Sequence, residues 1–304
     1  MSSPSDLAPR VWLYSSFALG PAGGNPASVV LSSHPISTQA AQAIARDLSV
    51  PTTGFTVSDE ATAKGTANVR FFTPEQEIDA CGHVTIAIAI ALVESGIWGW
   101  GEDTLIRAPG GEFPLRLRQG KVEMEQRRQL LEACDIDWAE VEEALGSVRK
   151  RPDLPLAIAG TGLRHLIVPL ADSAALREIT LDGTRIAALA ERALVDTVCV
   201  WAPGSDRNHF RMRDLCAAIG AIEEPASGTT SGALALYLAQ HGQLASQELV
   251  VEQGVEMGRP SRIEVVLASP DHVTVRGGAR KVVEGTLVLP SACGSSRDRR
   301  KGAP

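Results

Sequence analysis

The chain has 304 residues, of which 44% are hydrophobic and 21% are charged, and its formal net charge at pH 7 is −7. This length and composition predict a globular protein of two domains, and the acidic balance argues against a nucleic-acid partner. No apolar run reaches the roughly 18 residues that a membrane span needs, so no membrane partner is expected. Five cysteines without a C-x-x-C pair, and a start without a signal-peptide pattern, favour reduced thiols in the cytoplasm.

Hydrophobic periodicity and turn residues predict alternating strands and helices along the chain. Strands are expected at residues 11–14, 27–31, 55–57, 67–72, 104–106, 113–117, 121–124, 163–168, 195–201 and 209–213. Helices are expected at residues 37–48, 84–94, 127–147 and 185–193. The run after His83 alternates isoleucine and alanine like a strand, but its alanine content and its lack of a breaker favour a buried helix. The charged helix at 127–147 is interpreted as a hinge between domains.

Two turns of small residues each precede an apolar run. The first turn is Ala80-Cys81-Gly82-His83 and the second turn is Ala226-Ser227-Gly228-Thr229. Each lets backbone N–H groups point toward an anion, and each carries a polar side chain at the same position. Facing each other, the two turns would hold a small carboxylate between two helix N-termini.

The second half of the chain repeats the order of the first, in which strands lead to a small-residue turn and an apolar run. This order predicts an α+β protein of two pseudo-symmetric halves, with strands wrapped around a central helix in each and the site in the cleft between them. We expect an N-terminal half at residues 10–126, with a return of the chain near 280–292, and a C-terminal half at 127–279. The end at 294–304 is expected to be disordered.

Several short motifs carry a resemblance over nearly the whole chain, from about Val11 to Leu289. In chain order they are Gly24-Asn25-Pro26-Ala27, Phe72-Thr73-Pro74, Gly82-His83, residues 224–229, residues 253–261 and residues 273–279. With these motifs the chain resembles the PhzF-like (phenazine-biosynthesis) family. The resemblance implies the diaminopimelate epimerase-like fold, with a barrel-like sheet around a central helix in each half. It also implies proton transfer on a small amino-acid-like substrate without a cofactor, and a possible homodimer.

The chain departs from the family pattern at its reactive positions. Where the family has a catalytic Glu in a Leu-Ser-Glu-Thr turn, this chain has Val50-Pro51-Thr52-Thr53, so that Thr52 replaces the acid. A thiol, Cys81, stands where the family has a small inert residue. The epimerase and racemase relatives carry a Cys before a Gly in both turns, whereas this chain has Ser227 in the second.

Cys81 is therefore the candidate base. A cysteine at a helix N-terminus has its pKa lowered, because the dipole and the N–H groups favour the thiolate. His83 is interpreted as its electrostatic partner, which binds the substrate or steers its protonation. Cys-x-His alone is too sparse for a zinc site, so no metal is expected. The remaining thiols and histidines are interpreted as structural or exposed: Cys134, Cys199, Cys216, Cys293, His34, His165, His209, His241 and His272.

The resemblance makes Glu224 the acid that contacts the amine or ring of the substrate; the alternative is an exposed loop carboxylate. The candidate substrate-binding residues are Asn25, Thr52, Gly82, Ser227, Gly228 and Thr229. A hydroxyl is not deprotonated near neutral pH without a strong activating partner, so Ser227 cannot mirror Cys81 as a second base. This disfavours a two-thiol racemase.

These features predict a cofactor-independent isomerase that moves a proton, with migration of a double bond, on a small amino or imino acid of secondary metabolism. One alternative is a dehydratase or epimerase of a proline-like amino acid. A second alternative is a non-catalytic protein that binds a small carboxylate.

Overall fold

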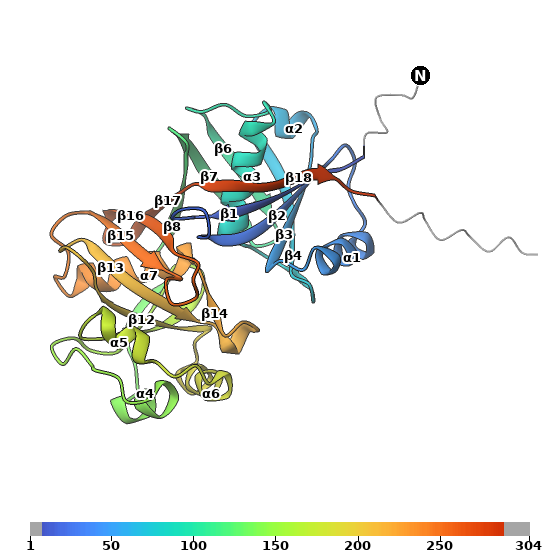
Figure 1. Ribbon diagram of the computed structural model, residues 1–304. Coiled ribbons are helices and arrows are strands. Elements are labelled where there is room, and N and C mark those ends of the chain that lie inside the picture. The colour runs from blue at the N-terminus through green and yellow to red at the C-terminus, as the bar shows by residue number, and fades with distance from the viewer. Residues whose placement is uncertain (1–7, 289–304) are drawn as a thin grey trace, which may run out of the picture.

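The computed structural model describes residues 8–288, and their strands form one continuous hydrogen-bonded sheet that wraps into two halves (Figure 1). The first half contains β1 (Arg10–Ser16), β2 (Asn25–Ser32), α1 (Thr38–Leu48), β3 (Thr52–Val57), α2 (Glu60–Ala63), β4 (Thr66–Phe72), β5 (Glu77–Ile78), α3 (Gly82–Glu94), β6 (Asp103–Ala108), β7 (Gly111–Arg118) and β8 (Lys121–Arg127). The second half contains β9 (Leu130–Ala133), α4 (Trp138–Leu145), β10 (Ala157–Gly160), β11 (Arg164–Pro169), α5 (Ser173–Glu178), α6 (Gly183–Ala193), β12 (Thr197–Pro203), β13 (His209–Leu215), the 3-10 helix η2 (Ala217–Ile219), β14 (Glu223–Glu224), α7 (Gly228–Gln240), β15 (Glu248–Gln253), β16 (Ser261–Ser269) and β17 (His272–Gly277). The chain then returns to the first half as β18 (Ala279–Thr286), which pairs antiparallel with β1.

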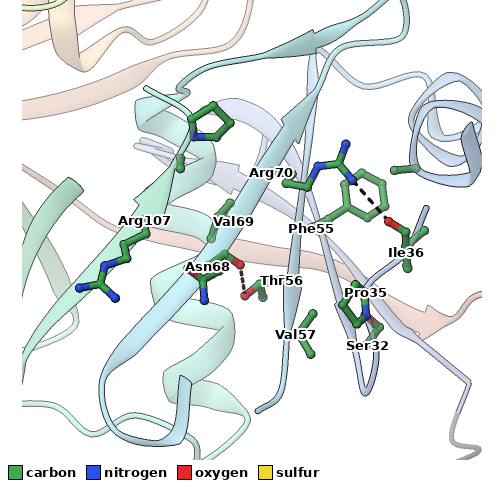
Figure 2. Close-up of a pocket in the computed structure, with 13 residues that line it drawn as sticks. Ser32, Pro35, Ile36, Phe55, Thr56, Val57, Asn68, Val69, Arg70 and Arg107 are labelled. Carbon is green, nitrogen blue, oxygen red and sulfur yellow. Dashed lines mark hydrogen bonds between the residues drawn. The ribbon is translucent and has the colours of Figure 1, made fainter. Parts of the chain in front are cut away.

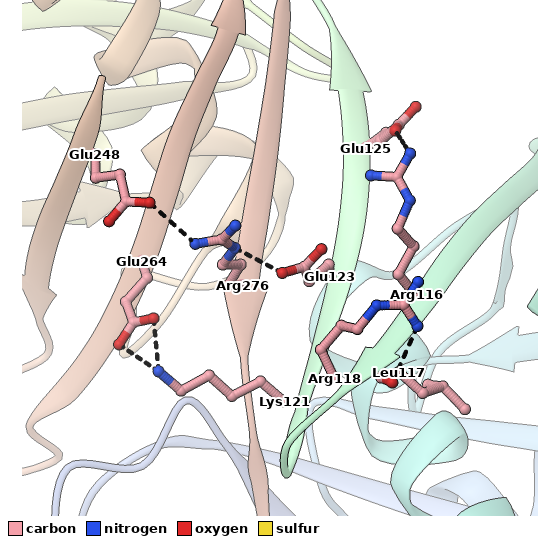
Figure 3. A network of polar contacts seen from close by, with 9 residues as sticks. All are labelled: Arg116, Leu117, Arg118, Lys121, Glu123, Glu125, Glu248, Glu264 and Arg276. Atoms are coloured by element: carbon pink, nitrogen blue, oxygen red, sulfur yellow. Dashed lines mark hydrogen bonds and ion pairs between the residues drawn. The ribbon is translucent and has the colours of Figure 1, made fainter. Parts of the chain in front are cut away.

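Backbone pairing joins the two halves, because β8 pairs antiparallel with β17. Figure 3 shows the ion pairs that cover this joint. Arg276 lies 2.8 Å from Glu123 and 3.4 Å from Glu248, and Lys121 lies 2.7 Å from Glu264. Partly exposed pairs of this kind contribute little to stability, so the β8–β17 ladder holds the joint.

Each half is built around one buried helix, α3 in the first and α7 in the second. Both helices have 13 residues and bury nearly every side chain. A helix that is apolar on all sides needs protein on all sides. The strands β1, β2, β3, β8 and β18 surround α3, and β10, β11, β16 and β17 contact α7. The α+β prediction and the helix after His83 are confirmed.

The predicted helix at 127–147 is wrong in its first part and confirmed in its second. Residues 130–133 instead form β9, which pairs antiparallel with β10, and the helix α4 begins only at Trp138. The start is fixed by a capping box, in which the Asp137 side chain accepts from the Glu140 amide and the Glu140 side chain accepts from the Asp137 amide, each at 2.9 Å. The partner strand β10 escapes prediction because its sequence, Ala-Ile-Ala-Gly, is short and poor in β-branched residues.

This cap gives a first prediction. Replacement of Asp137 by alanine leaves the Glu140 amide without its acceptor, and we expect the free energy of unfolding to fall by about 1 kcal/mol. Urea unfolding followed by circular dichroism measures the change. Asp137→Asn, which keeps a capping oxygen, is the matched control and should lose less; equal losses would show that the cap does not stabilise α4.

Within residues 8–288, no helix is long and apolar enough to cross a membrane. The domain limit predicted at residues 126 and 127 falls inside β8 and stays a prediction. The predicted tail at 294–304 and Cys293 lie outside the described residues.

Candidate functional site

The two turns occupy equivalent places in the two halves, because Cys81 is the N-cap of α3 and Ser227 is the N-cap of α7. Their backbones are similarly extended, with φ −153° and ψ 107° at Cys81 and φ −133° and ψ 116° at Ser227. The Ser227 hydroxyl caps its helix by accepting from the Thr230 amide at 3.3 Å. The Cys81 sulfur makes no such capping bond within the described chain. The Ser227 side chain is thus bonded to the backbone of its own helix, whereas the Cys81 side chain is not.

A chain of polar contacts links the first turn to the second. The Cys81 Sγ lies 3.4 Å from Nδ1 of His83, which lies 3.3 Å from Nδ2 of Asn25. The same Asn25 nitrogen donates to Oε2 of Glu224 at 3.3 Å and to the carbonyl of Ala226 at 2.9 Å. The structure therefore brings four of the candidate residues together, and Asn25 is the bridge between the halves.

The backbone before Asn25 requires glycine. Gly24 has φ +91°, and a Cβ there would lie 2.8 Å from the carbonyl oxygen of Ser16. Residues of the second half hold this glycine, since its amide donates to Ser261 Oγ at 3.2 Å and its carbonyl accepts from Arg259 Nε at 2.9 Å. The start of β2 is thereby fixed against the second half. Fully buried Asn25 also has a side-chain oxygen, Oδ1, that lacks a hydrogen-bond partner among the residues described.

The electrostatics of the site reverse one prediction. Burial raises the pKa of the Cys81 thiol to about 12, and the charge of Glu224 adds to the rise. The helix amides of Val84 and His83 and the Thr52 hydroxyl favour the thiolate but are outweighed. The expected lowering of the thiol pKa is therefore wrong, because the cost of burying a charge exceeds the effect of the helix N-terminus.

The other two titratable groups shift in opposite directions. Burial lowers the pKa of His83 to about 4, so its ring is neutral at pH 7. Burial also raises the pKa of Glu224 to about 7; the charge of Asp214 adds to this rise and the hydrogen bond from Asn25 opposes it. Glu224 is half-buried rather than exposed on a loop. Its carboxyl is therefore the group that gains and loses a proton near neutral pH.

The remaining candidates are placed as follows. Thr52, the first residue of β3, is buried, and its hydroxyl favours the thiolate form of Cys81. Gly82 and Gly228 are the first residues of α3 and α7. Thr229 Oγ1 lies 3.2 Å from Ser227 Oγ. Within the described residues, neither side chain hydrogen-bonds to the first turn directly; the connection is made by Asn25, which donates to Glu224 and to the carbonyl of Ala226, just before Ser227.

Three buried residues of the second half were missed. Gln253 accepts from the Ser227 amide at 2.9 Å and donates to the Glu224 carbonyl at 2.7 Å, and so ties the second turn to the strand before it. Its Gln-Gly motif was the available signal. Asp214 lies opposite Glu224 in the β13–β14 pair and accepts from the Thr230 hydroxyl at 2.7 Å. Neither Asp214 nor Thr230 stands in a motif that would have singled it out.

Two cavities lie away from this site. One of about 350 Å³ opens beside β3, β4 and β6 and is lined by Phe55, Val69, Arg70 and Arg107 among others (Figure 2). Another, of about 450 Å³, is lined by residues of β13, β15 and β16. None of the candidate residues lines either cavity. In the described range, no group of three or more His, Cys, Asp or Glu side chains could hold a metal ion.

Comparison with known proteins gives one family. The model of the PhzC-PhzF family, phenazine biosynthesis-like protein, matches residues 14–285. An uncharacterized isomerase of Deinococcus radiodurans is 34% identical over 281 residues, which cover 88% of each chain. The trans-2,3-dihydro-3-hydroxyanthranilate isomerase of Pseudomonas chlororaphis is 31% identical over 282 residues, which cover 90% of this chain and 97% of the relative.

Solved structures confirm the predicted fold. A PhzF-family phenazine biosynthesis protein of Bacillus anthracis superposes with a TM-score of 0.82 at 24% identity, covering 93% of this chain and 100% of the other. A probable proline racemase of Agrobacterium radiobacter superposes with a TM-score of 0.59 at 14% identity, covering 93% of each chain. At these identities the likeness extends to the fold alone.

Proposed function

This chain is an isomerase of the PhzC-PhzF family of phenazine biosynthesis-like proteins, and we propose that it moves a proton between two carbon atoms of a small unsaturated amino acid without a cofactor. The observation that carries the proposal is the carboxyl of Glu224. Its pKa is about 7, and it is joined through Asn25 to the group that includes His83 and Cys81. A general base works best when its pKa is near the working pH.

In the proposed reaction Glu224 takes the proton and Cys81 supplies one. The Glu224 carboxylate removes a proton from carbon, the electron pair shifts along the double bond, and the Cys81 S–H gives its proton to the far carbon. The proton on Glu224 then returns to the sulfur, so that both groups end as they began. Because the charge of Glu224 raises the pKa of Cys81, proton uptake by Glu224 makes the thiol a stronger acid at the step that needs one.

Two further features support this assignment. Thr52 stands where the family has a catalytic carboxylate, and its hydroxyl cannot transfer a proton in place of that carboxylate. The Thr52 hydroxyl does stabilise the thiolate of Cys81, and the Cys81 thiol can transfer a proton. The first N–H groups of a helix have no acceptor within the helix. In α7 these include the N–H groups of Gly228 and Thr229, and we assign both to the substrate carboxylate.

The test is solvent exchange. Incubated in D2O with trans-2,3-dihydro-3-hydroxyanthranilate or related cyclic amino acids, the enzyme should give a product with the double bond moved and with deuterium on carbon. Loss of water from hydroxyproline would instead assign a dehydratase. Calorimetric binding of the same compounds without any exchange would assign a binding protein, and either result contradicts the proposal.

The pKa of Glu224 predicts the pH profile. Because the ionised carboxylate is the base, kcat/KM should rise about tenfold per pH unit below pH 7 and level off above it. His83 stays neutral above about pH 4 and adds no step near pH 7. Initial rates from pH 5 to 9 measure the profile. A rate that keeps rising to pH 9 would assign the base to a group with a higher pKa.

A further inference from the structure

A buried chain of hydroxyl groups runs from the second turn to a carboxylate. The Ser227 Oγ lies 2.8 Å from the Thr230 Oγ1, and the Thr230 hydroxyl donates to Oδ2 of Asp214 at 2.7 Å. On its other side, Oδ1 of Asp214 accepts from the Thr197 hydroxyl at 2.7 Å, and Thr197 lies 2.7 Å from Nδ1 of His165. Asp214 is 2% exposed and Thr230 is fully buried. Water therefore does not compete for these bonds.

The direction of the chain follows from counting hydrogens. A threonine hydroxyl has one hydrogen, and Thr230 gives it to the carboxylate of Asp214, the strongest acceptor within reach. The contact between Thr230 and Ser227 must then use the Ser227 hydrogen, with Thr230 as the acceptor. The Ser227 hydrogen is thus turned inward along the chain. One lone pair of the Ser227 oxygen accepts from the Thr230 amide at 3.3 Å, so toward a bound molecule Ser227 offers its second lone pair and no hydrogen.

We infer that Asp214 is a positioning residue which, through Thr230, makes Ser227 a hydrogen-bond acceptor for the amino group of the substrate. The amides of Gly228 and Thr229 stand beside this acceptor at the start of α7. Two N–H groups that can donate to a carboxylate thus lie beside a hydroxyl oxygen that can accept from an amine. This arrangement fits an amino acid whose carboxylate and amino group are close together. The inference rests on the proposed function, and it adds the residues that recognise the amino group of the proposed amino-acid substrate.

The test compares two probes that differ only by an amine, 3-hydroxyanthranilate and 3-hydroxybenzoate, with calorimetry of the full chain. The wild type should bind the amine-bearing probe about tenfold more tightly, the contribution of one hydrogen bond. Thr230→Val should remove this preference, because it deletes the hydroxyl that joins Ser227 to Asp214, and Thr230→Ser, which keeps the hydroxyl, should retain it.

Thr197→Val is the matched control, because it also deprives one oxygen of Asp214 of its donor but on the side away from Ser227. It should lower the melting temperature as much as Thr230→Val does and leave the preference intact. A preference unchanged in Thr230→Val, or lost equally in Thr197→Val, overturns the inference, as does a wild type that binds both probes equally or neither. A failure of the proposed function is distinguishable, since absence of deuterium exchange leaves this preference in place.

Discussion

Replacement of Glu224 by glutamine is expected to lower kcat by about 10²–10⁴-fold, the range of a lost general acid–base group. The amide keeps the size of the side chain and can still accept from Asn25, which donates to the carboxylate at 3.3 Å. Only the capacity to take up a proton is removed. Steady-state rates with the substrate identified by deuterium exchange, measured at pH 7, give the effect.

A control for this variant lies at the other end of α3. Like Glu224, Glu94 accepts a side-chain hydrogen bond, here from the Tyr14 hydroxyl at 2.8 Å, but Glu94 is exposed and lies at the last residue of the helix, away from both turns. Glu94→Gln should keep its kcat within a factor of about two, as expected for a group outside the reaction. A similar loss in both variants would mean that Glu224 acts through stability rather than through chemistry.

Glu224→Gln should also change how the free energy of unfolding depends on pH. The pKa of Glu224 rises from 4.5 to about 7 on folding, so between these values the folded protein holds a proton that the unfolded chain has released. Stability from this group is therefore complete below pH 4.5 and is lost as the pH rises to 7. His83 has the opposite sign, because its pKa falls from 6.5 to about 4 and stability is lost as the pH falls through this range. Glu224→Gln should remove only the first slope from unfolding measured between pH 4 and 8.

Local sequence was enough to find the two turns that begin α3 and α7, since small residues before an apolar run mark a helix start. It also placed Asn25, Cys81, His83 and Glu224 in one site through their motifs, and the structure brings these four together.

The pKa of Cys81 could not be found in this way. A helix N-terminus lowers a thiol pKa and is visible in the sequence. The burial that outweighs it, and the added charge of Glu224 from the second half, arise only when the chain folds. Asp214 was missed for a similar reason, because only the β13–β14 pairing places it opposite Glu224. The first part of segment 127–147 was wrongly predicted as helix, because β9 forms a strand only by pairing with β10.

Cys81→Ala should lower kcat by about 10²-fold or more, since the proton donor in the proposed reaction is lost. Cys81→Ser should recover little, because a hydroxyl is a weaker acid than a thiol. Substrate affinity should change less than kcat in both variants, as expected when an interaction acts mainly in the transition state. Rates and calorimetric binding on the same preparations separate the two effects, and a Cys81→Ala variant with full activity would remove the thiol from the mechanism.

The thiol can also be tested without a substrate. At a pKa of about 12 almost none of Cys81 is thiolate at pH 7, so iodoacetamide should alkylate it far more slowly than it does a free cysteine. In Glu224→Gln the neighbouring negative charge is gone, so the pKa of Cys81 falls and alkylation should become faster. Mass spectrometry of the peptide that contains Cys81 reports both rates, and half-buried Cys134, remote from Glu224, serves as the internal control. Acceleration at Cys81 alone would show that the two groups share one field, the coupling through which a proton taken by the carboxyl prepares the thiol to give one. Equal rates in the two proteins would show that they titrate independently and that proton uptake by Glu224 cannot assist Cys81.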